Sequence, residues 1–370
     1  MKKILMIGPF PEPVHGMSMA NEILFHGLCE KGYKMDHINT ALLSKIQSTK
    51  DQNKISFEKF FIAIKHMTGE LLKLFKNKYD LIYITPGHSF LGFMRYSPYM
   101  IFCSIKKIPY LLHSHGGQLG QTYNDSGTLK KALLKFFVKK SKGAIVLGES
   151  LKWMFQDMIP HDKILVCHNG VPRNVLSPEE DIDKKIDKIT EQTNLLYLSN
   201  LMKEKGVLDL LNSLEYLDEK KLNYRLNLAG NIEKNLEREV FALIEKHKDR
   251  VSYLGVLGGE EKRRLLLNSD IFILPTYYPI EGQPISILEA MINGCAIVTT
   301  DQGGIGDIFK KNLNGIECLK KNPYSIYTAI LETAKELKKF QKYNYEKAIN
   351  DYRPEDFVER VNRIMTSSIK

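Results

Sequence analysis

The chain has 370 residues, of which 43% are hydrophobic and 26% charged, and a formal net charge of +10. This length suits two domains of about 150–200 residues each, and the hydrophobic fraction is ordinary for a soluble globular protein. Five cysteines without a C-x-x-C pair predict neither a disulfide framework nor a zinc site. No secretory h-region and no apolar run long enough to span a bilayer are seen, so we expect a cytoplasmic protein.

The positive charge is concentrated in the N-terminal half. Residues 1–170 contain 23 Lys and Arg against 12 Asp and Glu, whereas residues 171–370 contain 30 against 31. Basic amphipathic stretches occur at 54–78, 90–105 and 130–142. Each suits either a helix packed on a sheet with its lysines in water or a helix facing an anionic membrane. We therefore expect an anionic partner for this half, and a protein that is cytoplasmic or peripheral on the inner face of the plasma membrane.

The first half alternates strand-like runs with helical stretches. Residues 2–8 are an apolar run ending in Gly8, followed by a turn-rich loop to Gly16 and a helical stretch from Met17. A strand, a Gly-containing loop and a helix form the general plan of a phosphate-binding unit. Further strand-like runs, typical of a buried parallel sheet, lie at 79–85, 108–113, 143–147 and 163–167.

Two histidines stand at the end of the run 108–113. His113 is expected to be a core residue, and we expect His113 and His115 to point to opposite faces, which argues against a metal shared by the two. His115 precedes two glycines at a strand end, where ligands bind in open α/β sheets.

A polar segment separates the two halves. Residues 173–193 are rich in charged residues and are predicted to link a domain at 1–172 to a domain at 194–344. Asp181 and Asp183 form an Asp-x-Asp pair in this segment, but they do not follow a buried strand, so we do not expect a metal site there.

The most informative stretch runs from Glu281 to Gly294, after the apolar run 271–274. Pro284 suits the first position of a helix, and Gly294 suits its C-terminal end. Glu281 thus precedes the helix and Glu289 lies within it. Backbone N–H groups and the positive end of the helix dipole suit a diphosphate beside Glu281, and a helical carboxylate can accept hydrogen bonds from two vicinal hydroxyls, as on a ribose.

Glu281 and Glu289, with seven residues between them, resemble the E-x7-E motif of the retaining GT-B glycosyltransferases of family 4, also called group 1. The similarity extends over nearly the whole chain, most clearly over 1–16, 113–117, 163–170 and 195–307. It implies an α/β fold of the GT-B type, with two doubly wound, Rossmann-like parallel-sheet domains facing an interdomain cleft. A C-terminal helix at about 345–370 would pack back on the first, acceptor-binding domain.

The resemblance implies transfer of a sugar, with retention at the anomeric carbon, from a nucleotide diphosphate sugar to a hydroxyl group. The catalytic candidates are Glu281, which would orient the transferred sugar, and His115, which would contact sugar or acceptor. Glu289 would hold the ribose and Lys205 the diphosphate. The other candidates for the donor site are Gly16, Asn200, Val256 (through its backbone, at the base), Gly282, Gln283, Pro284 and Ile285. Asn200 stands where the family commonly has an Arg, so Lys205 would supply more of the charge compensation.

Lysine and helix N-termini can replace a metal at a diphosphate, so neither a metal nor a cofactor is expected. The favoured donor is a UDP-sugar. The expected acceptor is a glycan linked to a lipid diphosphate, in capsule, O-antigen or exopolysaccharide synthesis, and no nucleic acid partner is expected.

Two other functions are compatible with parts of the sequence. A GT-B sugar-nucleotide 2-epimerase would convert the donor without an acceptor, and the loop Glu281-Gly282-Gln283-Pro284 argues against it. A non-catalytic glycosyltransferase-like binding subunit, which Asn200 makes conceivable, would bind nucleotide weakly and keep its function in a Glu289→Ala variant.

Overall fold

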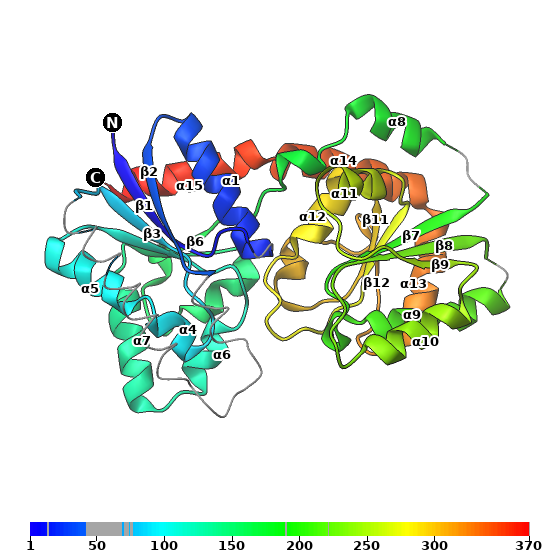
Figure 1. Ribbon diagram of the computed structural model, residues 1–370, viewed down its shortest axis with the longest axis horizontal. Helices are drawn as coiled ribbons and strands as arrows, with labels where there is room; N and C mark the ends of the chain where they lie inside the picture. Colours follow the sequence, from blue (N-terminus) through cyan, green and yellow to red (C-terminus); the bar gives the residue numbers. More distant parts are fainter. Residues whose placement is uncertain are drawn as a thin grey trace. The chain divides into compact units, whose positions relative to one another are not determined.

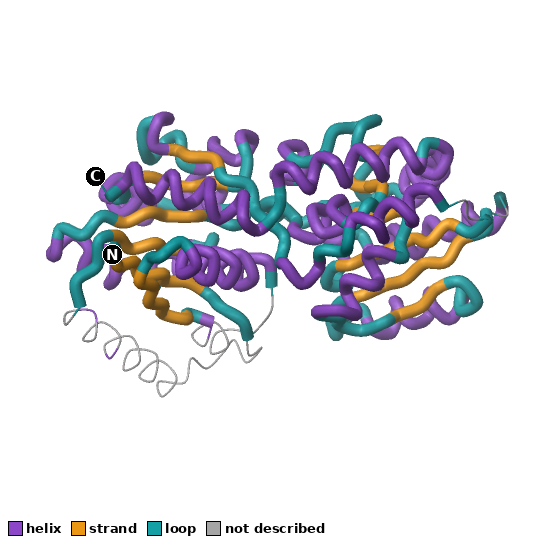
Figure 2. Tube along the Cα trace, turned by 90° about the horizontal axis from the view of Figure 1, so that it is seen from above, coloured by secondary structure: helices purple, strands orange, loops and turns teal. Residues whose placement is uncertain are grey.

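A computed structural model of the chain describes residues 1–12, 15–41, 69, 74, 77–188, 191–220 and 222–369. The chain divides into two compact units, one formed by Met1–His168 with Pro354–Lys370 and the other by Asn169–Arg353. Each unit has its own group of strands (Figure 2). The basic stretch predicted at 54–78 lies almost wholly outside the described residues.

The first unit contains a parallel sheet of six strands in the order β2-β1-β3-β4-β5-β6. Its elements are β1 (Lys3–Gly8), α1 (Gly16–Glu30), β2 (Lys34–Asn39), β3 (Leu81–Ile84), α4 (Phe90–Met94), α5 (Ser97–Lys106), β4 (Tyr110–His113), α6 (Leu119–Asn124), α7 (Thr128–Lys140), β5 (Gly143–Val146), η1 (Glu149–Met154), η2 (His161–Lys163), β6 (Ile164–Val166) and α15 (Pro354–Ser368). All residues of β3, β4 and β5 are buried, as expected for strands covered on both faces. Helices α1 and α15 cover one face and α4, α5, α6 and α7 the other (Figure 1).

The second unit contains another parallel sheet of six strands, in the order β12-β11-β10-β7-β8-β9. Its elements are η3 (Arg173–Val175), α8 (Glu179–Asp187), β7 (Thr193–Leu198), η4 (Lys203–Lys205), α9 (Val207–Glu219), β8 (Tyr224–Ala229), α10 (Glu237–Lys246), β9 (Val251–Tyr253), α11 (Gly259–Leu267), β10 (Ile271–Leu274), α12 (Ile285–Ile292), β11 (Ala296–Thr299), η5 (Gly303–Asp307), β12 (Gly315–Glu317), α13 (Pro323–Lys335) and α14 (Leu337–Asp351). Helices α9, α10 and α13 cover one face, and α11, α12 and α14 cover the other (Figure 1). The α/β fold with two doubly wound parallel sheets is therefore confirmed.

The segment predicted as a linker, 173–193, is instead folded within the second unit. It contains η3, α8 and the first residue of β7. Ile182 is fully buried, and the Lys185 ammonium donates to the Asn293 carbonyl at 2.6 Å. A helix with many charges can thus be anchored by a single apolar side chain, and the charged composition concealed this packing.

The C-terminal helix predicted at about 345–370 is two helices. The first, α14, ends at Asp351 in the second unit, and α15 begins at Pro354 in the first. Proline lacks the N–H that a continuous helix would need, but it is accommodated in the first turn of a new one. Helix α15 lies against α1, where Val358 occupies the space that a side chain at Gly27 would take. In the described part of the chain, every helix is too short or too polar to cross a bilayer.

Candidate active site

Three loops meet at the carboxyl ends of neighbouring strands β7, β10 and β11 in the second unit. These strands are paired in parallel, so the loops 199–206, 275–284 and 300–307 leave the same edge of the sheet. The Tyr277 N–H donates to the Glu204 carbonyl at 2.8 Å, and the Gly304 N–H donates to the Gly282 carbonyl at 2.9 Å. The middle loop is therefore tied to both of its neighbours.

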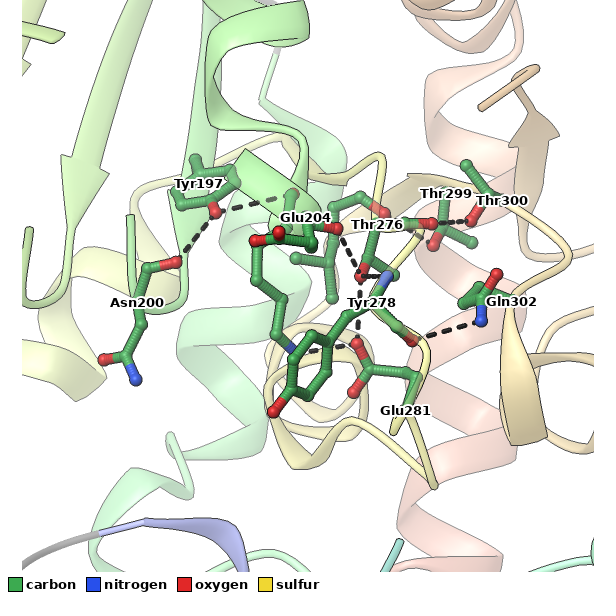
Figure 3. Close-up of polar contacts among 11 residues, drawn as sticks. Tyr197, Asn200, Glu204, Thr276, Tyr278, Glu281, Thr299, Thr300 and Gln302 are labelled. Atoms are coloured by element: carbon green, nitrogen blue, oxygen red, sulfur yellow. Dashed lines mark hydrogen bonds and ion pairs between the residues drawn. The ribbon is translucent and has the colours of Figure 1, made fainter. Parts of the chain in front are cut away.

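Lys205 and Glu281 form an ion pair within these loops. The Lys205 ammonium lies 2.6 Å from Glu281 Oε2, and their side chains are 14% and 8% exposed. Thr276 donates to the same oxygen at 3.0 Å, and Lys205 Nζ lies 4.9 Å from the centre of the Tyr278 ring. Figure 3 shows the Glu281 carboxylate directed at Thr276 beside that ring. Because an ammonium has three donors and a carboxylate about four acceptor positions, both groups keep capacity for a ligand.

Two tyrosine hydroxyls near this pair remain protonated. The Tyr197 hydroxyl donates to the backbone carbonyls of Asn200 at 3.0 Å and Lys205 at 3.5 Å (Figure 3). Burial, followed by the charge of Glu281, holds the pKa of Tyr197 well above its usual value. The same two causes raise the pKa of Tyr278. Tyr197 thus fixes the loop that presents Lys205 at any physiological pH.

Two glycines allow the loops to approach closely. Gly206 has a φ of +77°, and a Cβ there would lie 2.3 Å from the Pro275 carbonyl oxygen. Gly303 has a φ of +58°, and a Cβ there would lie 2.1 Å from the Glu281 carbonyl oxygen. Other side chains would be strained and would clash at both positions. The position of the Lys205–Glu281 pair therefore depends on Gly206, next to Lys205, and on Gly303, in the loop that touches Glu281.

The second carboxylate, Glu289, is buried on helix α12. It is 2% exposed, and the Lys262 ammonium of helix α11 lies 2.6 Å from both of its oxygens. A buried carboxylate requires such a partner because burial of an unpaired charge is costly. Lys262 was not predicted from the sequence, where nothing local relates two positions 27 residues apart. The only hint of Lys262 was indirect: a Glu289 buried on a helix would need a cation nearby.

The loop between the two carboxylates is also fixed. Pro284 is the N-cap of α12 and Ile285 its first residue, so the helix begins one residue later than the sequence predicted. Gln283 Oε1 accepts a hydrogen bond from the Asn169 N–H at 2.7 Å, and both side chains are nearly fully buried. Gln283 is thus held by a hydrogen bond from Asn169, the first residue of the second unit.

The remaining donor candidates of this unit do not join the cluster. Asn200 is exposed, and its described contact is made by its backbone carbonyl. Val256 is 73% exposed and follows β9. Their roles at the donor are therefore not supported by contacts with Lys205, Glu281 or Glu289.

Gly16 and His115 belong to the first unit, at the carboxyl edge of its sheet. Gly16 is the first residue of α1, and His115 follows β4. The prediction that His113 and His115 point to opposite faces was wrong: their ring centroids are 4.1 Å apart at an interplanar angle of 34°. Alternate residues of an extended chain share a face, so their side chains meet. The expectation that His113 is a core residue is confirmed by its 0% exposure, and burial, then His115, holds its pKa well below the usual value.

The model of the family "glycosyl transferases group 1" matches residues 178–350, which include both carboxylates and both lysines. Residues 178–350 of this chain thus belong to the group 1 glycosyltransferases. It is 27% identical over 339 residues to an uncharacterized glycosyltransferase of Methanocaldococcus jannaschii, covering 85% of this chain and 84% of the relative. It is also 28% identical over 232 residues to the N,N'-diacetylbacillosaminyl-diphospho-undecaprenol alpha-1,3-N-acetylgalactosaminyltransferase of Campylobacter jejuni, covering 58% of this chain and 59% of the relative.

The fold of this glycosyltransferase is shared with solved GT-B structures. The Anabaena HepE protein in complex with UDP-glucose superposes with a TM-score of 0.71 at 16% identity, over 99% of this chain and all of the other. The GT-B fold predicted from the E-x7-E motif is thereby confirmed.

Proposed function

We propose that this glycosyltransferase moves a sugar from a nucleotide diphosphate sugar, with UDP-sugars favoured, to a hydroxyl of a glycan acceptor with retention at the anomeric carbon. The observation that carries the proposal is the pairing of two buried carboxylates, Glu281 and Glu289, each with its own lysine at 2.6 Å. In the proposal Glu289 accepts hydrogen bonds from the ribose hydroxyls, and Lys205 meets the diphosphate. Glu281 orients the transferred sugar, and His115 contacts the sugar or the acceptor.

Lys205 and the backbone N–H groups at the start of α12 would balance charge that develops on the departing diphosphate. Preorganised donors of this kind stabilise a developing charge most effectively where water is excluded. Lys205 is only 14% exposed, and its hydrogen bond to Glu281 holds it in place before the donor arrives. The proposal therefore includes activity without a divalent cation. The UDP-glucose bound by the similar Anabaena protein favours uridine donors.

The acceptor proposed is a glycan on a lipid diphosphate, in the assembly of a capsule, O-antigen or exopolysaccharide at the inner face of the plasma membrane. The Campylobacter relative, named as a transferase acting on a diphospho-undecaprenol glycan, supports this class of acceptor. The excess of Lys and Arg in residues 1–170 supports an anionic partner for that half.

The proposal is tested with a panel of UDP-, GDP-, ADP- and dTDP-sugars in EDTA, with and without bacterial lipid extract. We expect release of one nucleotide, stimulated by the extract, with the sugar recovered in the lipid fraction in the anomeric configuration of the donor. Donor conversion without acceptor would indicate an epimerase instead. An inverted anomer, or activity restored only by a divalent cation, would overturn the corresponding part of the proposal.

A further inference from the structure

Large apolar side chains are exposed on three neighbouring helices of the first unit, α4, α5 and α7. The exposed fractions are 71% for Leu91, 46% for Ile101, 65% for Ile105, 74% for Leu129 and 51% for Phe136. Helix α7 packs against both α4 and α5, so these side chains belong to one helical layer (Figure 1). A gathering of exposed apolar side chains marks a contact surface more often than single ones do.

The helical periodicity places the exposed side chains on the outer side of this layer. On α7, Leu129, Phe136 and Lys140 are separated by seven and four residues and therefore share a side, while Leu134 and Val138 are fully buried on the other. On α5, Ile101 and Ile105 are one turn apart and exposed. The outward side of both helices is thus partly apolar, in addition to the apolar side chains that their inward side buries in the core.

The segment that carries these apolar side chains is strongly basic. Residues 90–142 contain nine Lys and Arg against one acidic residue, Asp125. The basic residues are Arg95, Lys106, Lys107, Lys130, Lys131, Lys135, Lys139, Lys140 and Lys142. The net charge of this segment, +8, approaches the +10 of the whole chain. An anionic partner would therefore be favoured at this layer.

A basic pocket of about 380 Å³ lies at one end of this layer. Lys107, Lys140 and Lys142 line it together with Ser104, and none of its lining residues is acidic. It lies where β4 and β5 begin, at the opposite edge of the sheet from His115. Ile105 is next to Ser104 in α5, and the Lys140 ammonium lies 5.8 Å from the centre of the Phe136 ring. The pocket is therefore flanked by two exposed apolar side chains.

We propose that this α5–α7 face, consisting of Ile101, Ile105, Leu129, Phe136, Lys107, Lys140 and Lys142, binds a bilayer of anionic phospholipids. The pocket takes the phosphodiester of one headgroup, and the apolar side chains enter the boundary between headgroups and acyl chains. Lysines around exposed apolar residues suit this occupant because interfacial binding combines apolar burial with attraction to anionic lipids. Binding through this face requires neither the donor site nor turnover.

The proposal is tested by co-sedimentation of the full chain with vesicles of phosphatidylcholine, with and without phosphatidylglycerol, over a range of salt concentrations. We expect binding only to the anionic vesicles, weakening as salt rises. A Lys107→Gln/Lys140→Gln/Lys142→Gln variant should bind about a hundredfold more weakly, because each lysine near an anionic surface contributes a factor of about five. An Ile105→Ser/Phe136→Ser variant should lose at least about tenfold through lost apolar burial.

Matched controls come from exposed positions of the second unit. Lys220→Gln/Lys234→Gln/Lys335→Gln removes the same charge, and Phe241→Ser/Leu313→Ser removes comparable apolar surface. Both controls should bind as the wild type does. An equal loss of vesicle binding in the control lysine variant would show that only the overall charge matters, and would overturn the proposal. Binding of the wild type to neutral vesicles, or no binding to anionic vesicles, would also overturn it. Protection of the α5–α7 face by inorganic phosphate alone, without vesicle binding, would indicate a free phosphate instead.

The activity of the vesicle-binding variants separates this proposal from the proposed function. Nucleotide release with lipid acceptor dissolved in detergent should be unchanged in the variants of the α5–α7 face. If the wild type binds vesicles but releases no nucleotide, the proposed function fails and the membrane surface stands. If the wild type releases nucleotide but does not bind vesicles, the membrane-binding proposal fails and the proposed function stands.

Discussion

Lys205 and Glu281 neutralise each other at a distance of 2.6 Å, on two loops that leave neighbouring strands of one sheet. A diphosphate at Lys205 would have to share this lysine with the Glu281 carboxylate, or displace the carboxylate from the lysine. The pair therefore links two steps that can be measured separately, nucleotide binding and sugar transfer.

Glu281→Gln removes the charge and keeps the size of the side chain. We expect the nucleotide of the donor to bind at least as tightly as to the wild type, because its diphosphate no longer competes for Lys205, while transfer falls about a hundredfold or more. Lys205→Met should instead weaken nucleotide binding by about tenfold or more, since it removes a charge-assisted hydrogen bond. Calorimetric titration with the nucleotide and a transfer assay distinguish the two variants. An equal loss of nucleotide affinity in both would contradict this division of roles.

Gly303→Ala should disturb the Lys205–Glu281 pair, although Gly303 is not part of that pair. The added Cβ would lie 2.1 Å from the Glu281 carbonyl oxygen at a φ of +58°, so the loop holding Glu281 must shift. We expect a loss of about 1–3 kcal/mol in the free energy of unfolding and a fall in kcat. Gly306→Ala in the same loop is the matched control, because a Cβ there meets no described atom within 4 Å. Similar urea midpoints and turnover for the two variants would refute the role of Gly303.

Lys262→Met tests the second ion pair. It leaves Glu289 buried without its counter-ion, a change that costs several kcal/mol at fully buried pairs. We expect the KM for the donor to rise about tenfold, with a smaller change in kcat, because the affected interaction is one of ground-state binding. Lys262→Arg keeps the charge and should restore most of the affinity. An unchanged donor KM in Lys262→Met would separate Lys262 from the donor site.

The strands and the two carboxylates could be predicted from the sequence because they are local features. Apolar runs such as 271–274 predict buried strands by themselves, and Glu281, Pro284 and Glu289 occupy one continuous stretch. Lys262 could not be predicted in the same way, since it meets Glu289 only after α11 and α12 have packed in the same unit. The folding of α8 was missed because it depends on the burial of Ile182 among many charges.

Stability towards acid should depend on His88 of the first unit. Burial lowers the pKa of His88 to about 4, whereas an unfolded histidine titrates near 6.5. The unfolded state therefore binds a proton that the folded state excludes, and stability falls from pH 6.5 down to about 4, by about 1.4 kcal/mol per pH unit. Above pH 6.5 both states are neutral and no loss is expected.

His88→Asn stays neutral throughout and should lose less stability than the wild type between pH 6.5 and 4. The remaining acid sensitivity should include that of His113, whose pKa burial also lowers. Urea unfolding at pH 7.5, 5.5 and 4.5 measures both chains. Parallel losses in the two would show that His88 is not the titrating group.

Glu289→Ala tests whether the second unit holds a nucleotide sugar through its buried carboxylates. Nucleotide release from the active donor, in EDTA with lipid extract, is compared among the wild type, Glu289→Ala and the exposed control Glu237→Ala. We expect release by the wild type and by the control, and loss of release in Glu289→Ala with the fold retained as judged by circular dichroism. Full release by Glu289→Ala, or neither release nor thermal stabilisation by any nucleotide in the wild type, would contradict it.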